Sequence, residues 1–395
     1  MGIFSSGKSK EKNELALVFH IGSSSMGGVL FYMQDSGVPR IIFSVREPIP
    51  LQKTLDVDRF LISTIKSLDD IASRIYKANL GAPKKVFCVL SSPWCISQTR
   101  IINYSKNTPF TFTAKLADEL IKKETSLFKE QHLANYPNPN DLVRTIELKS
   151  IQTALNGYET SSPLDQKAKE LEMSIFISMS PENVLAKIEK TIYKNFHVTN
   201  VKFSSFAIAS FSLVRDLYTA EDNFLLVHIG GEVTEIAMVK KNIMRESISF
   251  PLGHNFMLRR VSANLDLSLD EAGSFISLFK DGHATGGAKK KIEPIMDKLK
   301  IEWLAEFQSS LANISSDISI PATIYIFINK DFANFFIETI KSEQFNQYTL
   351  TQSKFKIILI DTETLHGTAV FEGDSIRDPF IIADTVYINR FLNQK

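Results

Sequence analysis

Two segments of this chain share one pattern, and they lie half a chain apart. Residues 15–31 read LALVFHIGSSSMGGVLF, and residues 224–239 read FLLVHIGGEVTEIAMV. Each segment has an apolar strand, the tripeptide His-Ile-Gly, a short polar turn and a second apolar strand. His20 and His228 are 208 residues apart, which is too far for a solenoid repeat and fits two similar α/β domains. Paired domains of this kind commonly bind a ligand between them.

The composition narrows the class of partner. The 395 residues hold 45 Lys and Arg against 44 Asp and Glu, so the net charge of +1 gives no reason to expect a nucleic acid as partner. A hydrophobic content of 44% excludes a wholly disordered chain, and no apolar run reaches the ~18 residues of a transmembrane helix. The two cysteines are too few for a disulfide framework or a structural zinc site. We therefore expect a cytoplasmic protein without a transmembrane segment.

Strand and helix signals alternate through the rest of the chain. Apolar periodicity predicts helices at 55–79, 114–130, 181–196, 207–218, 265–279, 289–300 and 381–392. Strands are expected at 40–45, 85–90, 142–155, 171–177, 201–206, 324–328 and 355–360. Ser268 and Glu271 form a capping-box pattern, and Pro181 is expected in the first turn of its helix. A polar loop is expected at 135–141 and a glycine-rich loop at 281–288.

The two turns carry residue types that bind phosphate. A glycine turn lets backbone N–H groups approach an anion closely, and serine or threonine hydroxyls add donors. The candidates are His20, Gly22, Ser23 and Ser24 at the first turn and His228, Gly230, Gly231 and Thr234 at the second. Two such turns that face each other would hold a polyphosphate from both sides. The alternative is that these residues only close hairpins.

Several segments resemble motifs of one family, in the family's order. Residues 20–25 (HIGSSS) and 228–236 (HIGGEVTEI) resemble the two phosphate motifs of the actin-like ATPase superfamily. Residues 249–255 and 266–273 resemble the segment after its second motif. Residues 154–171 resemble the inserted SHS2 subdomain of the group that contains the cell-division protein FtsA and the pilus protein PilM.

This resemblance implies a fold and a domain plan. The fold would be an α/β, actin-like (ribonuclease H-like, duplicated) two-domain fold with an inserted SHS2-type α+β subdomain. The implied parts are a flexible tail at 1–13, domain 1 at 14–90 and 180–222, the SHS2-like subdomain at 91–179, domain 2 at 223–375 and a C-terminal helix at 376–395 that returns to domain 1. Whether the tail touches lipid is left open.

The chain departs from the family at its chemistry. The family has an aspartate where His20 and His228 stand, and those aspartates hold the waters around Mg²⁺. Mg²⁺ prefers oxygen ligands, so imidazole is a poor substitute. The glycine run of the adenosine motif is replaced by residues 329–332 (NKDF), whose side chains hinder close approach. We therefore expect no catalytic residues, no metal site and no ATP hydrolysis; weak ATP binding of doubtful magnesium dependence stays open.

The two histidines, the two cysteines and Trp94 each have a plain structural interpretation. A hydrogen-bonded cleft histidine is the simplest interpretation of His20 and His228; a transition-metal pair and a charge switch near neutral pH are the others. Cys88 and Cys95 are expected to be buried thiols without a nucleophilic role. Trp94 is expected in the core, with a partner contact as the alternative.

The expected function is a scaffold of the FtsA/PilM group at the cytoplasmic face of the membrane. Its partner would be a PilN-like membrane-protein tail or an FtsZ-like C-terminal peptide, with self-association also open. The last helix ends near Lys395 without a membrane-binding helix after it, which favours the PilM-like role. The alternative is a nucleotide-binding, FtsA-like division ATPase that recruits FtsZ. A sugar kinase on the same fold is disfavoured because no carboxylate base is evident in the cleft.

Overall fold

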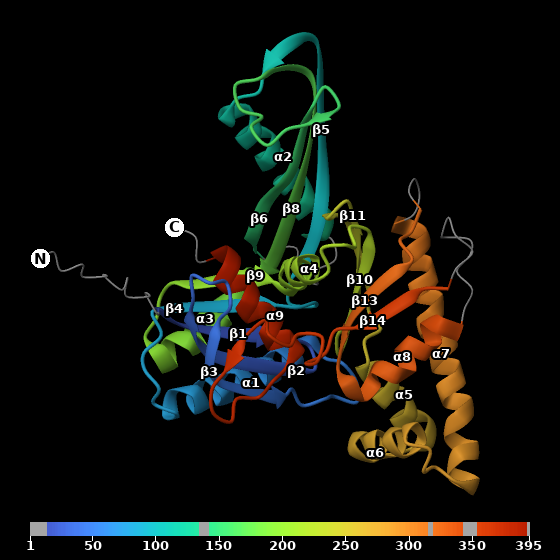
Figure 1. Ribbon diagram of the computed structural model, residues 1–395. Coiled ribbons are helices and arrows are strands. Elements are labelled where there is room, and N and C mark those ends of the chain that lie inside the picture. The colour runs from blue at the N-terminus through green and yellow to red at the C-terminus, as the bar shows by residue number, and fades with distance from the viewer. Residues whose placement is uncertain (1–13, 134–141, 315–318, 343–353, 393–395) are drawn as a thin grey trace, which may run out of the picture.

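The computed structural model describes residues 14–133, 142–314, 319–342 and 354–392 (Figure 1). The N-terminal tail and the polar loop expected at 135–141 lie outside these residues. No helix in these ranges combines the length and apolarity that a membrane span requires.

Two sheets carry the two halves of the chain. The first has the strand order β15-β3-β2-β1-β4-β9 and the second the order β12-β11-β10-β13-β14. The strands of the first sheet are β1 (Glu14–Ile21), β2 (Ser25–Met33), β3 (Arg40–Pro48), β4 (Lys85–Leu90), β9 (Val201–Ser205) and β15 (Val370–Phe371). Those of the second are β10 (Phe224–Ile229), β11 (Thr234–Lys240), β12 (Ile243–Phe250), β13 (Thr323–Ile328) and β14 (Lys356–Leu359).

The two sheets repeat one topology. In the first, β1 pairs antiparallel with β2 and parallel with β4, and β9 follows β4 in parallel. In the second, β10 pairs in the same way with β11 and β13, and β14 follows β13. The central strands are buried on both faces, as their unbroken apolar sequences predict. The duplication inferred from the two His-Ile-Gly hairpins is therefore a duplication of whole sheets.

Helices separate and cover the sheets. The outer face of the first sheet is covered by α1 (Val57–Lys77) and α3 (Glu182–Phe196), and the second packs against α5 (Asn255–Leu265), α6 (Leu269–Lys280), α7 (Gly286–Ile314) and α8 (Lys330–Ser342). Between the sheets lie α4 (Phe206–Leu217) and α9 (Pro379–Tyr387), which continues as a π-helical turn, Ile388–Leu392. Side chains from both sheets and both of these helices form one apolar core. The two domains are thus joined through packed hydrophobic surface.

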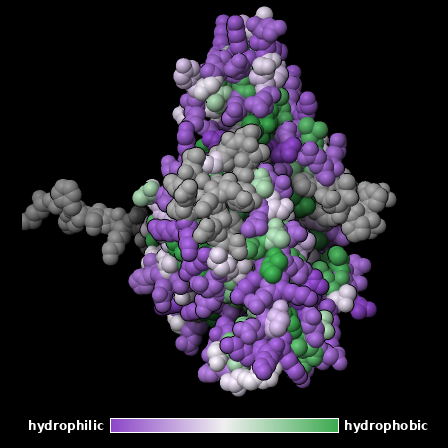
Figure 2. Space-filling view, turned by 90° about the vertical axis from the view of Figure 1, so that its right-hand side faces the viewer, coloured by the Kyte–Doolittle hydropathy of each residue, from purple (hydrophilic) through white to green (hydrophobic). Residues whose placement is uncertain are grey.

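An α+β subdomain projects from the first domain after β4 (Figure 1). It consists of β5 (Ile96–Thr111), α2 (Ala114–Leu133), β6 (Val143–Leu155), β7 (Tyr158–Glu159) and β8 (Lys167–Pro181), in the strand order β5-β8-β6-β7. One face of its sheet packs on α2. We call these elements the insertion. In Figure 2 the coloured surface of the molecule is mostly hydrophilic, with apolar atoms in separate patches.

A buried carboxylate joins the insertion to the rest of the molecule. Glu147 on β6 is 8% exposed and accepts hydrogen bonds from the Ser204 hydroxyl at 2.9 Å and from the Tyr387 hydroxyl at 2.5 Å. Ser204 lies on β9 and Tyr387 ends α9, so one side chain links three parts of the fold. Burial and this neighbouring carboxylate raise the pKa of the Tyr387 phenol, which keeps it a donor.

Most of the expected elements are present; α8 and β12 were not expected, and four further corrections follow. A glycine-rich loop was expected at 281–288, but the loop ends at residue 285 because α7 begins at Gly286. This helix was expected to end at residue 300, but it continues to Ile314 with Pro294 inside it. Pro181 ends β8 and precedes α3 instead of lying in its first turn. Neither α5 nor the long strand β5 was expected; β5 is held by its ladder with β8 despite many exposed polar residues. The Ser268–Glu271 capping box is confirmed at the start of α6.

Candidate functional site

The two glycine turns lie at matching strand ends. In each turn the N–H of the glycine that begins it forms a hydrogen bond within the turn. Gly22 connects β1 to β2, and its N–H donates to the carbonyl of Ser25 at 3.2 Å. Gly230 connects β10 to β11, and its N–H donates to the carbonyl of Val233 at 2.9 Å. Neither N–H is therefore aimed at a ligand.

The turns of the two domains touch each other. The Ser23 hydroxyl, in a side chain 3% exposed, accepts a hydrogen bond of 3.1 Å from the N–H of Glu232. A Cβ placed on Gly231 would lie 2.7 Å from Ser24 Cβ and 2.8 Å from Ser24 N, closer than atoms pack in proteins. The carbonyl of Gly231 accepts from the N–H of Asn255 at 2.8 Å. The glycine is needed here because protein backbone, not a ligand, approaches it.

Thr234 has no free hydroxyl. Its side chain is fully buried, donates to the carbonyl of Leu252 at 2.7 Å, and accepts from Trp303 Nε1 at 3.2 Å. Both contacts lie within the second domain. Thr234 therefore ties the start of β11 to the helical layer and does not face the other domain.

His20 is paired with a carboxylate that the sequence did not suggest. It lies near the end of β1, and its Nδ1 is 2.8 Å from Oδ2 of Asp384 on α9. Both side chains are buried, at 3% and 0% exposure. Burial lowers the pKa of His20 to about 3 and raises that of Asp384 well above its ordinary value. Both shifts favour the uncharged forms of the two side chains, and Oδ1 of Asp384 has no hydrogen-bond partner among the described residues.

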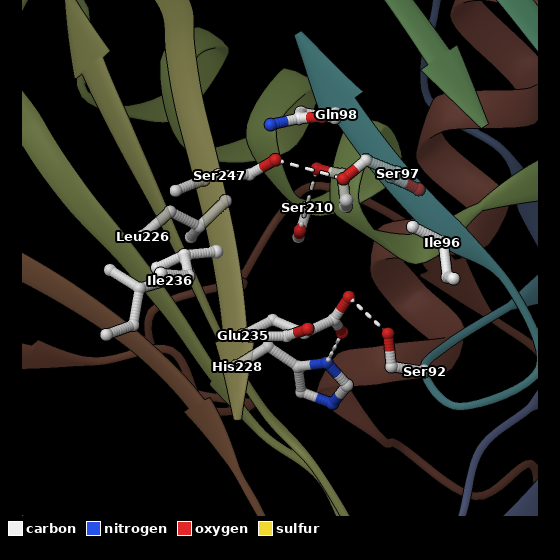
Figure 3. A pocket seen from close by; sticks show the side chains of 14 residues that line it. Ser92, Ile96, Ser97, Gln98, Ser210, Leu226, His228, Glu235, Ile236 and Ser247 are labelled. Atoms are coloured by element: carbon white, nitrogen blue, oxygen red, sulfur yellow. Dashed lines mark hydrogen bonds and ion pairs between the residues drawn. The ribbon is translucent and has the colours of Figure 1, made fainter. Parts of the chain in front are cut away.

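His228 is paired inside its own hairpin. Its Nδ1 is 2.9 Å from Oε2 of Glu235, and Oε1 of that carboxylate accepts from the Ser92 hydroxyl at 2.7 Å (Figure 3). Ser92 follows β4 of the first domain, so this relay crosses between the domains. The serine donates to the carboxylate and not to the imidazole, an arrangement that does not activate it as a nucleophile.

Two phenylalanine rings lie between the histidines. The ring of Phe206, the first residue of α4, is 5.1 Å from the His20 ring and 4.8 Å from the His228 ring. The ring of Phe380 on α9 is 5.4 Å from the first and 5.7 Å from the second. The structure thus brings both predicted histidines to the same place, where aromatic carbon fills the space between them.

The similarity of this chain to known proteins lies in its structure. No protein-family profile matches the chain, and no curated protein matches its sequence. Its structure is similar to a solved PilM-PilN type IV pilus biogenesis complex, with a TM-score of 0.60, 14% identity, and coverage of 94% of this chain and 97% of that one. The fold is actin-like. The predicted two-domain α/β fold is confirmed.

Two further actin-fold comparisons are more distant. A Bacteroides thetaiotaomicron protein with actin-like ATPase fold and unknown function has a TM-score of 0.38 and 8% identity over 91% of this chain and 94% of that one. The ethanolamine utilization protein EutJ from Carboxydothermus hydrogenoformans has a TM-score of 0.40 and 10% identity over 94% of this chain and 88% of that one.

The site does not fit a magnesium triphosphate held between the two turns of the actin-like fold. The histidines bind carboxylates, two turn donors are used within their own turns, and the hydroxyl of Ser23 is used across the domain contact. Within the described ranges no group of three or more His, Cys, Asp or Glu side chains is arranged to hold a metal ion. The two turns are in direct contact in this arrangement.

An open cavity of about 390 Å³ lies beside the turns. Ser24, Arg46, His254 and Asn329 are among its lining residues. The guanidinium of Arg46 is bound to Asp378 and to the Ser25 hydroxyl, so its charge is neutralised. His254 is 3% exposed, and burial lowers its pKa to about 4, so it is neutral near pH 7. This cavity offers room for a small ligand beside the first turn.

The plain alternatives for the cysteines and the tryptophan are confirmed. Cys88 and Cys95 are buried free thiols, and burial raises both pKa values, which makes them unreactive. Trp94 is buried, its Nε1 donates to the carbonyl of Gly22 at 2.8 Å, and its ring stacks on Phe60. Trp94 therefore supports the first turn from within the core.

The partners of the histidines were missed. Asp384 is an isolated acid in the apolar helix sequence PFIIADTVY, which is a recognisable signal of a buried, paired carboxylate. Glu235 stands inside the second motif itself, directly opposite His228 in the strand register. Phe206 and Phe380 carry no such signal, since an apolar residue at a helix start is common.

Proposed function

We propose that this chain is a scaffold that acts by binding protein partners at the cytoplasmic face of the membrane, without ATP hydrolysis. The observation that carries the proposal is the direct contact between the two turns, Ser23 to Glu232. An actin-like ATPase needs phosphate and metal between those turns, and here that space holds protein hydrogen bonds and aromatic rings. The family's two magnesium-binding aspartates are replaced by His20 and His228, and imidazole is a poor substitute for the oxygen ligands that Mg²⁺ prefers.

The proposed partner is the cytoplasmic tail of a PilN-like pilus-assembly membrane protein. The support is the similarity to the PilM-PilN complex, which extends over nearly the full length of both chains. The insertion, which we propose to be of the SHS2 type of the FtsA/PilM group, adds surface for such a partner. A location at the inner face of the membrane follows from the proposed partner.

The second candidate is an FtsA-like division protein that binds nucleotide and recruits FtsZ. It needs a phosphate site that opens, whereas the two domains here share one apolar core around α4 and α9. The closed turns favour the scaffold over this candidate. Self-association is compatible with both.

Fluorescence anisotropy with two labelled peptides separates the candidates. One peptide is the cytoplasmic tail of the PilN-like protein of the same organism, and the other is the C-terminal peptide of its FtsZ. The proposal expects saturable binding of the first and none of the second, with a scrambled tail as the control. Binding of the FtsZ peptide alone would establish the second candidate, and binding of neither would overturn both.

A further inference from the structure

Three cavities of about 350, 290 and 430 Å³ follow the line where the insertion approaches the second sheet. Alternate residues of β12 line all three cavities. Ser247 and Ser249 line the first, Ile243 lines the second and Arg245 lines the third. The opposite wall comes from β5, β6 and β8 of the insertion. We call the space between β12 and this wall the trough.

Each wall of the trough includes the edge strand of a sheet. β12 is the edge strand of the second sheet, and β5 is the edge strand of the sheet in the insertion. They are joined at the base, where the Ser247 hydroxyl donates to the carbonyl of Ser97 at 3.0 Å (Figure 3), but they form no common ladder in the described chain. An edge strand offers unpaired backbone donors and acceptors that an added extended segment can use. From Ile243 to Ser249 β12 is roughly 20 Å long, the length of about six extended residues.

The charges of the trough point to a basic ligand. Four carboxylates line its cavities, against one guanidinium, that of Arg245. The four are Glu159, Glu170, Glu172 and Glu235. The first three are exposed at the rim, and Glu235 lies deeper, at 20% side-chain exposure, where it also binds Ser92 and His228.

An orphaned acceptor points the same way. Gln152 lines two of the cavities, and its Oε1 is buried and finds no hydrogen-bond partner within the described part of the chain. A buried acceptor without a donor is unfavourable and is stabilised by a ligand that brings an N–H group. The carboxylates and this amide oxygen together describe a ligand rich in hydrogen-bond donors.

We propose that the trough binds an extended, basic peptide segment of a partner protein, which pairs along β12 and places a lysine or arginine side chain toward Glu235. The inference rests on the proposed function only for the kind of protein that carries the segment. Phosphate-containing ligands are disfavoured, because the four carboxylates would repel them.

The test is peptide selection on the full chain. A phage-displayed library of random 12-residue peptides is selected against the immobilised protein, and the enriched peptides are measured by fluorescence anisotropy at low and high salt. We expect sequences enriched in Lys and Arg whose affinity falls with salt. Enrichment of acidic peptides, or of none, would overturn the proposal.

Matched charge reversals then place the binding site. The double variant Glu170→Lys/Glu172→Lys changes exposed side chains on the trough face of β8, and it should weaken binding of the selected peptides about tenfold or more. The control Glu119→Lys/Glu130→Lys makes the same change on α2, which covers the other face of that sheet, and should change binding less than twofold. Equal effects of the two variants would contradict the trough.

One more arm separates this proposal from the proposed function. The PilN-like tail peptide is measured on the same two variants. If the tail binds both with equal affinity, the partner is right and the trough is wrong. If the tail does not bind while basic selected peptides bind and are sensitive to Glu170→Lys/Glu172→Lys, the trough is right and the partner is wrong.

Discussion

The hydroxyl of Ser23 and the backbone N–H of Glu232 are 3.1 Å apart and join the glycine turns of the two domains. The contact does not stand alone. Arg259 binds the Glu232 carboxylate with two nitrogens, at 2.6 and 2.7 Å, and donates from Nε to the carbonyl of Gln52 in the first domain at 2.8 Å. A phosphate-type turn has thus become a part of the interface between the domains.

The tightness of this interface gives a first prediction. Gly231→Ala places a methyl group 2.7 Å from Ser24 Cβ, so the turns must separate, at a cost of about 2–4 kcal/mol of unfolding free energy. Urea unfolding followed by tryptophan fluorescence measures it. The control is Gly287→Ala in α7, where nothing lies within 4 Å of the added group and the stability should not fall. Equal stabilities of the two variants would mean that the turns are not in contact.

The pair of His20 and Asp384 gives a second prediction. His20→Leu or Asp384→Leu leaves one buried polar group without its partner, and each should cost about 2–4 kcal/mol. The double variant should cost less than the sum of the two by at least about 1 kcal/mol, because it leaves no orphan. Chemical denaturation of the four proteins forms the cycle. Additive costs would show that the two side chains do not interact.

Replacing His20 with an acid gives a third prediction. His20→Asp places a second carboxyl group beside buried Asp384, so we expect a loss of about 3–5 kcal/mol. Adding Asp384→Asn removes the acid-to-acid contact and should recover a large part of that loss. A thermal melt of both variants decides it; a His20→Asp protein as stable as the parent would show that position 20 is not enclosed by α9.

The pH dependence of the free energy of unfolding gives a fourth prediction, which concerns His254. Burial lowers its pKa to about 4, whereas an unfolded histidine titrates near 6.5. Between pH 4 and pH 6.5 the unfolded chain binds a proton at His254 that the folded chain does not bind. The stabilisation that comes from the neutral His254 is therefore complete above pH 6.5 and is lost as the pH falls toward 4. His20 acts in the same direction, and the raised pKa of Asp384 acts in the opposite one.

His254→Gln isolates this contribution. Glutamine keeps a donor and does not titrate, so the slope of unfolding free energy between pH 4.5 and 6.5 should fall by up to about 1.4 kcal/mol per pH unit. Urea unfolding at five pH values measures the slope. An unchanged slope would mean that His254 is accessible to protons in the folded protein.

The hydrogen bond between Tyr387 on α9 and Glu147 in the insertion gives a fifth prediction. Tyr387→Phe removes the donor to Oε1 of buried Glu147, and we expect a loss of about 1–3 kcal/mol and faster amide exchange in β6. Hydrogen exchange read by mass spectrometry reports both domains at once. Tyr193→Phe, at an exposed position on α3, is the control and should leave exchange in β6 unchanged.

The sequence was sufficient for the duplicated fold because the two hairpins repeat both an apolar period and a tripeptide. His20 and His228 mark equivalent strand positions, and the structure brings them to the same two phenylalanines. Predictions based on local patterns, such as the capping box at Ser268, also held. These features depend on residues close in sequence or on a repeated motif.

What failed depends on distant residues. The partner of His20 is 364 positions away, and no local pattern connects Asp384 to it. The use of Ser23 as a structural group depends on how the two domains meet, around the shared apolar core of α4 and α9. The use of Thr234 depends on Leu252 and on Trp303, 69 positions away. Phosphate-binding and interface-forming glycine turns have the same sequence, so the sequence alone left both roles open.

Isothermal titration of the full chain with ATP, with and without Mg²⁺, tests the central claim most directly. The contact of Ser23 with Glu232 predicts no saturable heat up to millimolar ATP and no release of phosphate in either condition. Saturable binding that strengthens with Mg²⁺, or phosphate release above the buffer rate, would contradict the claim that the two turns stay in contact. It would indicate that the chain binds or hydrolyses ATP.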